Sequence, residues 1–424
     1  MLALMLLPLS ALAQEAEGAL ERPEYGSRSR VTMDYFSTVC MLQLYDDFSD
    51  PARVEAFEQT WEEILALLAV IDAELSLSMP ESDVSRFNAA TSGETVTVSA
   101  DTAAILDTVE EVFTLTGGRY DPTVSTLVDV FGFTPRFSQR RYQPVYGYDR
   151  EKVDGVLPLP EADTVAALRS LVQFDAIDRS GRTLTKNTAA ATIDGHTYQQ
   201  SLDLGGVGKG YAVDQVMALL RAKGYRYGYF SCGGSSIGIL SRATASRGAP
   251  EAAQWGIAVQ YPRFVTENEA LLRVFTRDQM LSTSGDYEHA YVLDGVHYSH
   301  LIDPQTGWPV NMPIDGVQSG ICSVTILGDN AAFCDALSTA LCVLGVEEAI
   351  DFMNQPHMQG YSYLMILYSD ASEVCEIVTD LPAERYELLD PERFVVVSAV
   401  DAQGRVTYHG NMFPDAVGVE GDGK

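Results

Sequence analysis

The sequence is poor in positive charge for its length. Its 424 residues include 28 Lys and Arg against 59 Asp and Glu, which gives a formal net charge of −31 at pH 7. This balance argues against binding to nucleic acids or to an anionic membrane surface, because both carry negative charge. Binding of an anion would therefore need a locally placed lysine, backbone amides or a metal ion.

The sequence also lacks paired cysteine motifs and long apolar runs. Its six cysteines form no Cys-x-x-Cys motif and most lie among apolar residues, which favours buried small side chains over a zinc site or a disulfide framework. These residues are Cys40, Cys232, Cys322, Cys334, Cys342 and Cys375. The apolar run at residues 1–13 is too short to span a bilayer. No repeat with a period of roughly 20–50 residues is evident.

The N-terminal run ends in a small-x-small site, Ala11-Leu12-Ala13, as a secretory signal peptide does, but no basic segment precedes it. The run is therefore either the end of a longer signal or an N-terminal helix. With the first interpretation we expect export to the outer face of the cytoplasmic membrane or beyond it, and with the second a cytoplasmic protein. Residues 14–32 are polar and are predicted to be a linker.

The rest of the chain is predicted to form one folded unit over residues 33–412 and a flexible tail at 413–424. Apolar spacing predicts helices at 54–75, 102–116 and 330–344, the last ended by Gly345. Strands are predicted at 35–45, 183–193 and 227–240, and surface excursions near 134–160 and 241–254. Because strands and helices do not alternate regularly, we expect an α+β fold.

The stretch 201–214, SLDLGGVGKGYAVD, is predicted to be a short strand, a glycine-rich turn and a helix that runs to about Lys223, with Gly224 in the left-handed position after it. Bare backbone amides at a helix N-terminus suit a phosphate, and Lys209 adds one positive charge. The stretch matches neither a P-loop, which needs Ser or Thr after the lysine, nor a dinucleotide-binding fingerprint. Taken alone, it is also compatible with a turn that only packs a helix on a strand.

Two further groups of residues can carry chemistry. Asp335 and Thr339 lie four apart on a predicted helix, so they can offer two oxygen ligands to one cation such as Mg²⁺, although such a pair is also typical of a cap or a solvated face. His300 precedes a sharp turn containing Pro304 that can present the imidazole rigidly. Asp286 is the competing candidate for a general base.

In their order along the chain, five segments resemble the FAD:protein FMN transferases, or ApbE-type flavin transferases. They are SDVSRFN at 82–88, GRYDPTV at 118–124, the stretch 201–214, SGDY at 284–287 with HLIDPQTG at 300–307, and SVT at 323–325 with DALSTAL at 335–341. The resemblance covers roughly residues 33 to 370. It implies two β-rich lobes with helices in one catalytic unit, with the flavin between the lobes.

The resemblance also implies an activity, a metal and a set of site residues. The activity is Mg²⁺-dependent transfer of FMN from FAD to a Ser or Thr of a target protein, with release of AMP and with His300 as general base. Mg²⁺ would be held by Asp335, Thr339 and the main-chain carbonyl of Gly206. Residues expected to bind FAD are Phe36, Ser78, Arg119, Tyr120, Asp121, Asp203, Lys209 and Ile302. Targets would be redox subunits of membrane electron-transfer complexes or exported flavoproteins.

The chain departs from the family pattern at three places. Ser78 stands where an aromatic residue is usual, and Ser338 stands where many relatives carry an acid beside the metal-binding threonine. An insertion near 311–320 lengthens the link to the next strand. Two other functions therefore stay open, a Mg²⁺-dependent FAD pyrophosphatase with water as acceptor and a flavin-binding protein without catalysis.

Overall fold

The computed structural model describes residues 26–133, 159–241, 254–260, 262 and 270–413. The predicted signal at 1–13, nearly all of the two surface excursions and the tail from 414 lie outside the described residues. Within the described ranges, no helix combines the length and the apolarity needed to cross a membrane.

Most of the helices gather near the main sheet. Their bounds are α1 Pro51–Leu75, α2 Asp83–Ala89, α3 Ala100–Leu115, α4 Ser125–Val130, α6 Ala162–Arg169, α7 Gly205–Ala222, α8 Ala331–Leu344 and α9 Val346–Met353. The predicted helices at 54–75, 102–116 and 330–344 are thus confirmed within a few residues at each end. Gly224 and Gly345, which follow α7 and α8, have positive φ angles of 82° and 78°, a backbone conformation that favours glycine.

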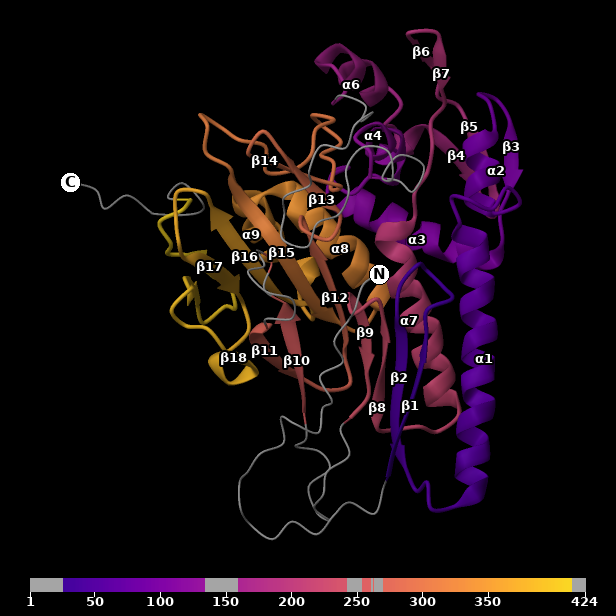
Figure 1. Ribbon diagram of the computed structural model, residues 1–424, viewed down its shortest axis with the longest axis vertical. Coiled ribbons are helices and arrows are strands. Elements are labelled where there is room, and N and C mark those ends of the chain that lie inside the picture. The colour runs from indigo at the N-terminus through magenta and orange to yellow at the C-terminus, as the bar shows by residue number, and fades with distance from the viewer. Residues whose placement is uncertain (1–25, 134–158, 242–253, 261, 263–269, 414–424) are drawn as a thin grey trace, which may run out of the picture.

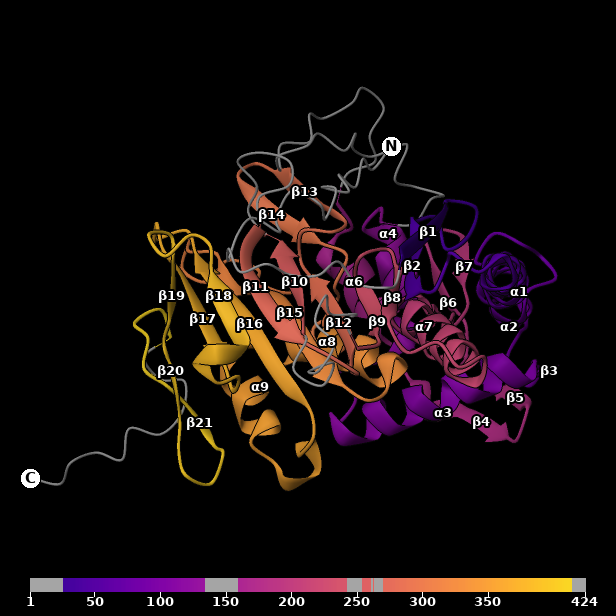
Figure 2. The ribbon, with the colours of Figure 1, turned by 90° about the horizontal axis from the view of Figure 1, so that it is seen from below.

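One antiparallel sheet of nine strands organises the larger lobe; only its last pair, β17 and β19, is parallel. In spatial order its strands are β1 Gly26–Thr32, β2 Cys40–Asp46, β8 Gly228–Cys232, β9 Ser236–Ile239, β12 Met280–Gly285, β15 Ser319–Gly328, β16 Ser362–Ser369, β17 Cys375–Thr379 and β19 Phe394–Val396. Helices α7 and α8 cover one face, and α3 packs against them on the side away from the sheet (Figures 1 and 2). The other face carries a three-stranded sheet of β10 Trp255–Gln260, β11 Ala270–Thr276 and β18 Tyr386–Leu388.

The central strand β15 is buried along nearly its whole length because both faces of the sheet are covered. Val324 and Ile326 belong to the large core under the helices, whereas Cys322 and Leu327 belong to the core between the two sheets. This two-sided burial includes the polar side chains of Ser323 and Thr325, which are buried along with their apolar neighbours.

A smaller lobe is built around α4 and α6. Leu127, Phe131, Val165 and Leu168 form its core together with Ile302. Its hairpins are β6 Ala191–Ile193 with β7 His196–Tyr198 and β13 Ala290–Leu293 with β14 Val296–Ser299. The other small sheets are β3 Thr95–Thr97, β5 Thr183–Lys186 and β4 Ile177–Ser180, and the hairpin β20 Ser398–Val400 with β21 Val406–Tyr408. The architecture is the expected α+β fold.

Helices α7 and α8 meet with almost no side chain between them. A Cβ placed on Gly210 would lie 2.3 Å from the carbonyl oxygen of Ala331, so only glycine allows this approach. The Gly210 amide donates a hydrogen bond of 2.9 Å to Asp335 Oδ2. Asp214 of α7 accepts the amides of Ala331 and Ala332, which caps the first turn of α8.

Three local predictions were wrong. Residues 26–32, predicted as part of a linker, form β1, because their backbone pairs with β2 along its full length. The strand predicted over 35–45 begins only at Cys40, since Phe36 and Ser37 adopt positive φ in a turn. No strand forms at 201–204, and the glycines that follow lie inside α7, where packing against α8 outweighs their poor helix propensity.

The glycine contact predicts a difference between two neighbouring substitutions. We expect Gly210→Ala to lower the free energy of unfolding by about 1–3 kcal/mol, because its methyl group meets rigid backbone. Gly208→Ala is the matched control in the same helix, since its methyl group would meet only the flexible end of Leu75 at 2.7 Å. Urea unfolding followed by circular dichroism measures both; equal losses would contradict the contact.

A second prediction concerns Lys186, which is fully buried on β5 and donates to the carbonyls of Ala90 and Asn88 at 2.7 and 3.3 Å. Burial lowers the pKa of Lys186 to about 8. Between pH 8 and roughly 10.5, Lys186 then binds a proton more often in the unfolded chain than in the folded protein. The contribution of Lys186 to the free energy of unfolding therefore rises with pH, by on the order of 2–3 kcal/mol over the whole range. We expect Lys186→Met to remove this rise. Unfolding free energies of both proteins across that range test it, and parallel pH profiles would refute it.

Candidate functional site

The start of α7 brings an acid, a glycine backbone and a lysine together. Asp203 Oδ1 accepts the Gly205 amide at 2.8 Å, and Lys209 Nζ turns back to the Gly205 carbonyl at 3.3 Å. The approach to this helix is held by Asn88, whose side chain both donates to and accepts from the backbone of Leu202, at 2.9 and 2.7 Å. The SDVSRFN segment therefore positions the chain just before Asp203.

The first turn of α7 faces the predicted metal-binding residues of α8. A Cβ on Gly206 would lie 3.3 Å from the Tyr120 hydroxyl and 3.7 Å from Thr339 Oγ1. The amide that a regular α-helix pairs with the Gly206 carbonyl is that of Gly210, and this amide is already donated to Asp335. The structure thus places Gly206, Asp335 and Thr339 in one neighbourhood.

A chain of hydroxyl groups connects the predicted metal-binding residues. Ser284 Oγ lies 2.9 Å from Thr339 Oγ1 and 2.7 Å from Ser338 Oγ, and Ser338 in turn donates to the Asp335 carbonyl at 2.8 Å. Ser338, one of the departures from the family pattern, is completely buried and belongs to this chain. Sequence reasoning did not assign Ser284 a role, because only the strand pairing of β12 with β15 brings it beside α8.

Lys209 is surrounded by carboxylates. Burial alone would lower its pKa, but the charges of Asp335, Glu288 and Asp203 outweigh that effect and raise the pKa of Lys209. Burial raises the pKa of Asp335 and of Asp203, and Lys209 opposes both shifts. Glu288 keeps an exposed edge, yet crowding by the surrounding protein raises its pKa as well. Three carboxylates therefore share one lysine.

The donor set fits a hard cation bound with help from other ligands. Carboxylate, hydroxyl and carbonyl oxygens are those that Mg²⁺ prefers. No group of three His, Cys, Asp or Glu side chains in the described ranges could hold a metal by itself. An ion here would therefore complete its coordination with waters and substrate phosphates, which is usual for Mg²⁺. The buried Tyr120 hydroxyl beside this position has no hydrogen-bond partner among the described residues.

His300 lies at the end of β14 with its ring edge-on to His289, 5.2 Å between centroids, and its amide donates to the His289 carbonyl at 2.9 Å. Its Nδ1 has no hydrogen-bond partner in the described ranges. Burial lowers the pKa of His300 to about 3, and the nearby His289 and Lys209 add to this shift. The imidazole is therefore neutral at physiological pH and can accept a proton.

Asp286, the competing base, is fully buried and accepts a hydrogen bond of 3.0 Å from Asn311 Nδ2. Asn311 begins the predicted insertion and also donates to the Ile321 carbonyl at 2.8 Å. The insertion is thus tied to the strand that follows it. These bonds favour a positioning role for Asp286, whereas Nδ1 of His300 has no such partner in the described ranges.

Five other predicted FAD-binding residues have structural partners. Arg119 forms an ion pair with Glu348 at 2.7 Å, and Asp121 accepts the amides of Thr123 and Phe174 at 2.7 and 3.3 Å. The remaining three are Phe36, whose amide donates to Asp72, the buried Ile302 in the core of the smaller lobe, and Ser78, exposed just after α1 beside Ser76. For Asp121 in particular the structure favours a cap over a ligand contact.

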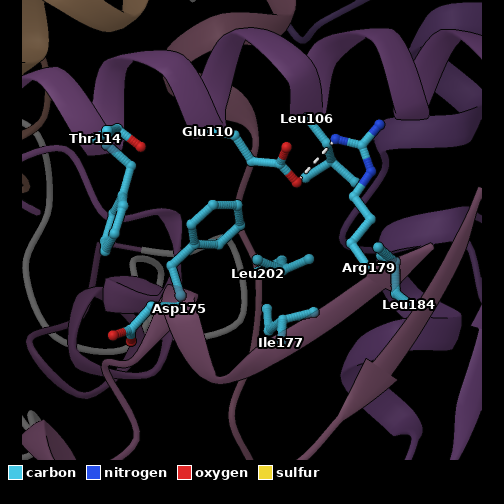
Figure 3. Close-up of a pocket in the computed structure, with 10 residues that line it drawn as sticks. Leu106, Glu110, Thr114, Asp175, Ile177, Arg179, Leu184 and Leu202 are labelled. Carbon is cyan, nitrogen blue, oxygen red and sulfur yellow. Dashed lines mark ion pairs between the residues drawn. The ribbon is translucent and has the colours of Figure 1, made fainter. Parts of the chain in front are cut away.

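The cavity shown in Figure 3 lies elsewhere. Its volume is about 210 Å³, and it lies between α3 and the β4–β5 hairpin, with Leu106, Ile177 and Leu184 in its wall. Arg179 at its edge is paired with Glu110 at 2.9 Å. Of the residues near the start of α7 it touches only Leu202. An apolar wall and a neutralised arginine make it a poor pyrophosphate site.

Comparison with known proteins agrees with the resemblance. The sequence model of the ApbE family matches residues 36–365. A FAD:protein FMN transferase of Haemophilus influenzae is 30% identical over 305 residues, which cover 72% of this chain and 78% of the relative. The protein of the same name from Vibrio cholerae is 30% identical over 288 residues, covering 68% and 74%.

Solved structures match over more of the chain. The flavin transferase ApbE from Vibrio cholerae has a TM-score of 0.62 at 25% identity and covers 84% of this chain and 97% of its own. The apo form of the Pseudomonas stutzeri flavinyl transferase ApbE has a TM-score of 0.60 at 25% identity, with 82% and 92% covered.

The hydroxyl chain predicts a role for Ser284 in cation binding. We expect Ser284→Ala to weaken Mg²⁺ binding by about tenfold, because Thr339 loses the partner that orients it. Ser284→Thr keeps a hydroxyl and should restore most of the affinity. Calorimetric titration with Mg²⁺ in the presence of FAD gives the affinity without turnover; unchanged binding in the alanine variant would show that the chain is only structural.

Proposed function

The chain belongs to the ApbE family, and we propose that it transfers FMN from FAD to a Ser or Thr hydroxyl of a target protein in a Mg²⁺-dependent reaction that releases AMP. Its curated relatives are named FAD:protein FMN transferase. The dependence on Mg²⁺ and the hydroxyl acceptor are the finer parts of the proposal. They are supported by the chemistry of the site.

The observation that carries the metal dependence is the charge around Lys209. The negative charges of three carboxylates, Asp203, Glu288 and Asp335, all raise the pKa of this one ammonium group, which is an excess of two negative charges when all are ionised. FAD brings a pyrophosphate with further negative charge into the same region. Repulsion of this size needs a divalent cation, and Asp335, Thr339 and the Gly206 carbonyl are the residues that would hold it. Bound Mg²⁺ would neutralise the pyrophosphate and favour displacement at phosphorus.

The reaction replaces the phosphoanhydride bond of FAD by a phosphoester bond to the target protein. The acceptor hydroxyl oxygen attacks the phosphorus of the FMN half of FAD, and the bond from that phosphorus to the bridging oxygen breaks, so that AMP leaves and FMN stays on the protein as a phosphoester. Lys209 and the positive end of the α7 helix dipole stabilise the charge that develops on the leaving phosphate. Their positions on one rigid helix need no rearrangement during the step.

His300 accepts the proton of the attacking hydroxyl. Its ring is neutral, and Nδ1 is not engaged by another group in the described ranges. A base of such low pKa is weak in the empty site. The arrival of the anionic substrate strengthens it, because nearby negative charge favours the protonated imidazole. The expected export stays a prediction, since residues 1–25 lie outside the described residues.

The proposal is tested by incubating the purified protein with FAD, Mg²⁺ and a flavin-acceptor domain, then measuring flavin fluorescence on a denaturing gel and free AMP. We expect covalent flavin and AMP in equal amounts, and loss of both with a chelator. Replacing the acceptor Ser or Thr by Ala in the target should abolish labelling, because no hydroxyl remains to attack.

Matched variants separate the roles of the site residues. Asp335→Asn and His300→Ala should each lower the transfer rate about 10²-fold or more, whereas the exposed controls Asp351→Asn and His196→Ala should not change it. Transfer at the wild-type rate by Asp335→Asn would show that Asp335 is not needed to bind the metal ion. Free FMN formed equally fast with and without acceptor would identify a pyrophosphatase instead, and FAD bound but never consumed would identify a binding protein.

A further inference from the structure

Two of the six cysteines are in contact although they lie 192 residues apart. Cys40 and Cys232 are directly opposite each other on the neighbouring strands β2 and β8 (Figure 1), and their sulfur atoms are 3.5 Å apart. Both side chains are completely buried. None of the proposed steps of FMN transfer uses either thiol.

The position of this pair in the ladder suits a covalent bond. The Gly233 amide donates to the Val39 carbonyl at 2.9 Å, so Val39 and Gly233 are a hydrogen-bonded pair of the ladder. Because such pairs alternate with non-hydrogen-bonded ones along an antiparallel ladder, the next pair, Cys40 with Cys232, is non-hydrogen-bonded. Opposite Cα atoms of a non-hydrogen-bonded pair are about 4.5 Å apart. This separation lies within the range of roughly 4.4–6.8 Å found for disulfides. The sulfur atoms need to close only the remaining distance between them.

A metal site is the other use of two thiols, and the surroundings do not support it. No third His, Cys, Asp or Glu joins the pair to form a metal-binding group in the described ranges. The hydrogen bond with Cys40 and burial both raise the pKa of Cys232, which disfavours the thiolate that metals bind. The same shift lowers the reactivity of the Cys232 thiol once the protein has folded.

We propose that Cys40 and Cys232 form a disulfide when the chain folds in the presence of a disulfide oxidant. Two S–H bonds break and one S–S bond forms; the two electrons and two protons convert one disulfide of the oxidant, such as glutathione disulfide, into two thiols. The bond forms before the strands are fully covered, because the folded protein shields both sulfur atoms.

The disulfide lies directly beside the start of the candidate active site. Gly233, next to Cys232, has φ of 71°, and a Cβ on it would lie 3.0 Å from Thr38 Oγ1 and 3.4 Å from Lys209 Cδ. Linking the two strands therefore holds the turn that Lys209 packs against. It also closes a loop of nearly 200 residues, which restricts the unfolded chain strongly.

The test compares protein refolded from denaturant in a glutathione redox buffer with protein refolded under dithiothreitol. After alkylation under denaturing conditions, mass spectrometry should show one fewer pair of alkylated thiols in the first sample and a peptide joining the segments of Cys40 and Cys232. Its melting temperature should be higher by roughly 5 °C, and dithiothreitol should abolish the difference.

Two variants complete the design. Cys232→Ser should give no cross-link, and Cys375→Ser should keep it, since Cys375 is on the far strand β17. The proposal fails if wild-type protein refolded with glutathione has all six thiols alkylated, or if its cross-link joins other cysteines. A cross-link without any rise in melting temperature would overturn the stabilising role. These outcomes do not depend on FAD transfer.

Discussion

The backbone contact between α7 and α8 is the constraint on which the site depends. Because Gly210 has no side chain, the first turn of α8 lies directly against it, and Asp335 can accept its amide. Asp214 then caps α8 from the same helix. The two helices that carry Lys209 and Asp335 are thus fixed to each other by backbone contacts, which tolerate less displacement than side-chain packing does.

Electrostatics then decide what this rigid pair of helices can bind. The protein is strongly acidic, and acidic groups are also in excess at the site, where the charges of three carboxylates act on Lys209. Such a site does not attract a pyrophosphate by itself. It suits a ligand that arrives with a divalent cation, because the cation satisfies the acids and the phosphates together. The hydroxyl chain through Ser284 and Ser338 orients this region without adding another charge.

Much of the fold was predictable because its signals are local. The helix at 330–344 was readable from Asn330 at its start and Gly345 at its end, and both act as caps in the structure. The prediction of a linker, by contrast, was wrong for residues 26–32. The exposed edge strand β1 has no apolar pattern of its own, and it forms because its backbone pairs with β2. The prediction of a turn at the glycine-rich stretch was wrong for a similar reason. Contacts with the neighbouring helix, rather than the helix propensity of its own residues, make the stretch helical.

The sequence by itself determined the helical periods, their caps, the acidic charge and the ordered motifs that place the chain in its family. It also contained Asp335, Thr339, Lys209 and His300 as candidates. Only the tertiary structure decided which candidates meet, which of them, such as Asp121, serve as caps, and that Ser284 touches Thr339. It also brought Cys40 into contact with Cys232. The reason is physical: periodicity and capping act over a few residues, whereas strand register and helix packing join groups that the sequence separates by a hundred residues or more.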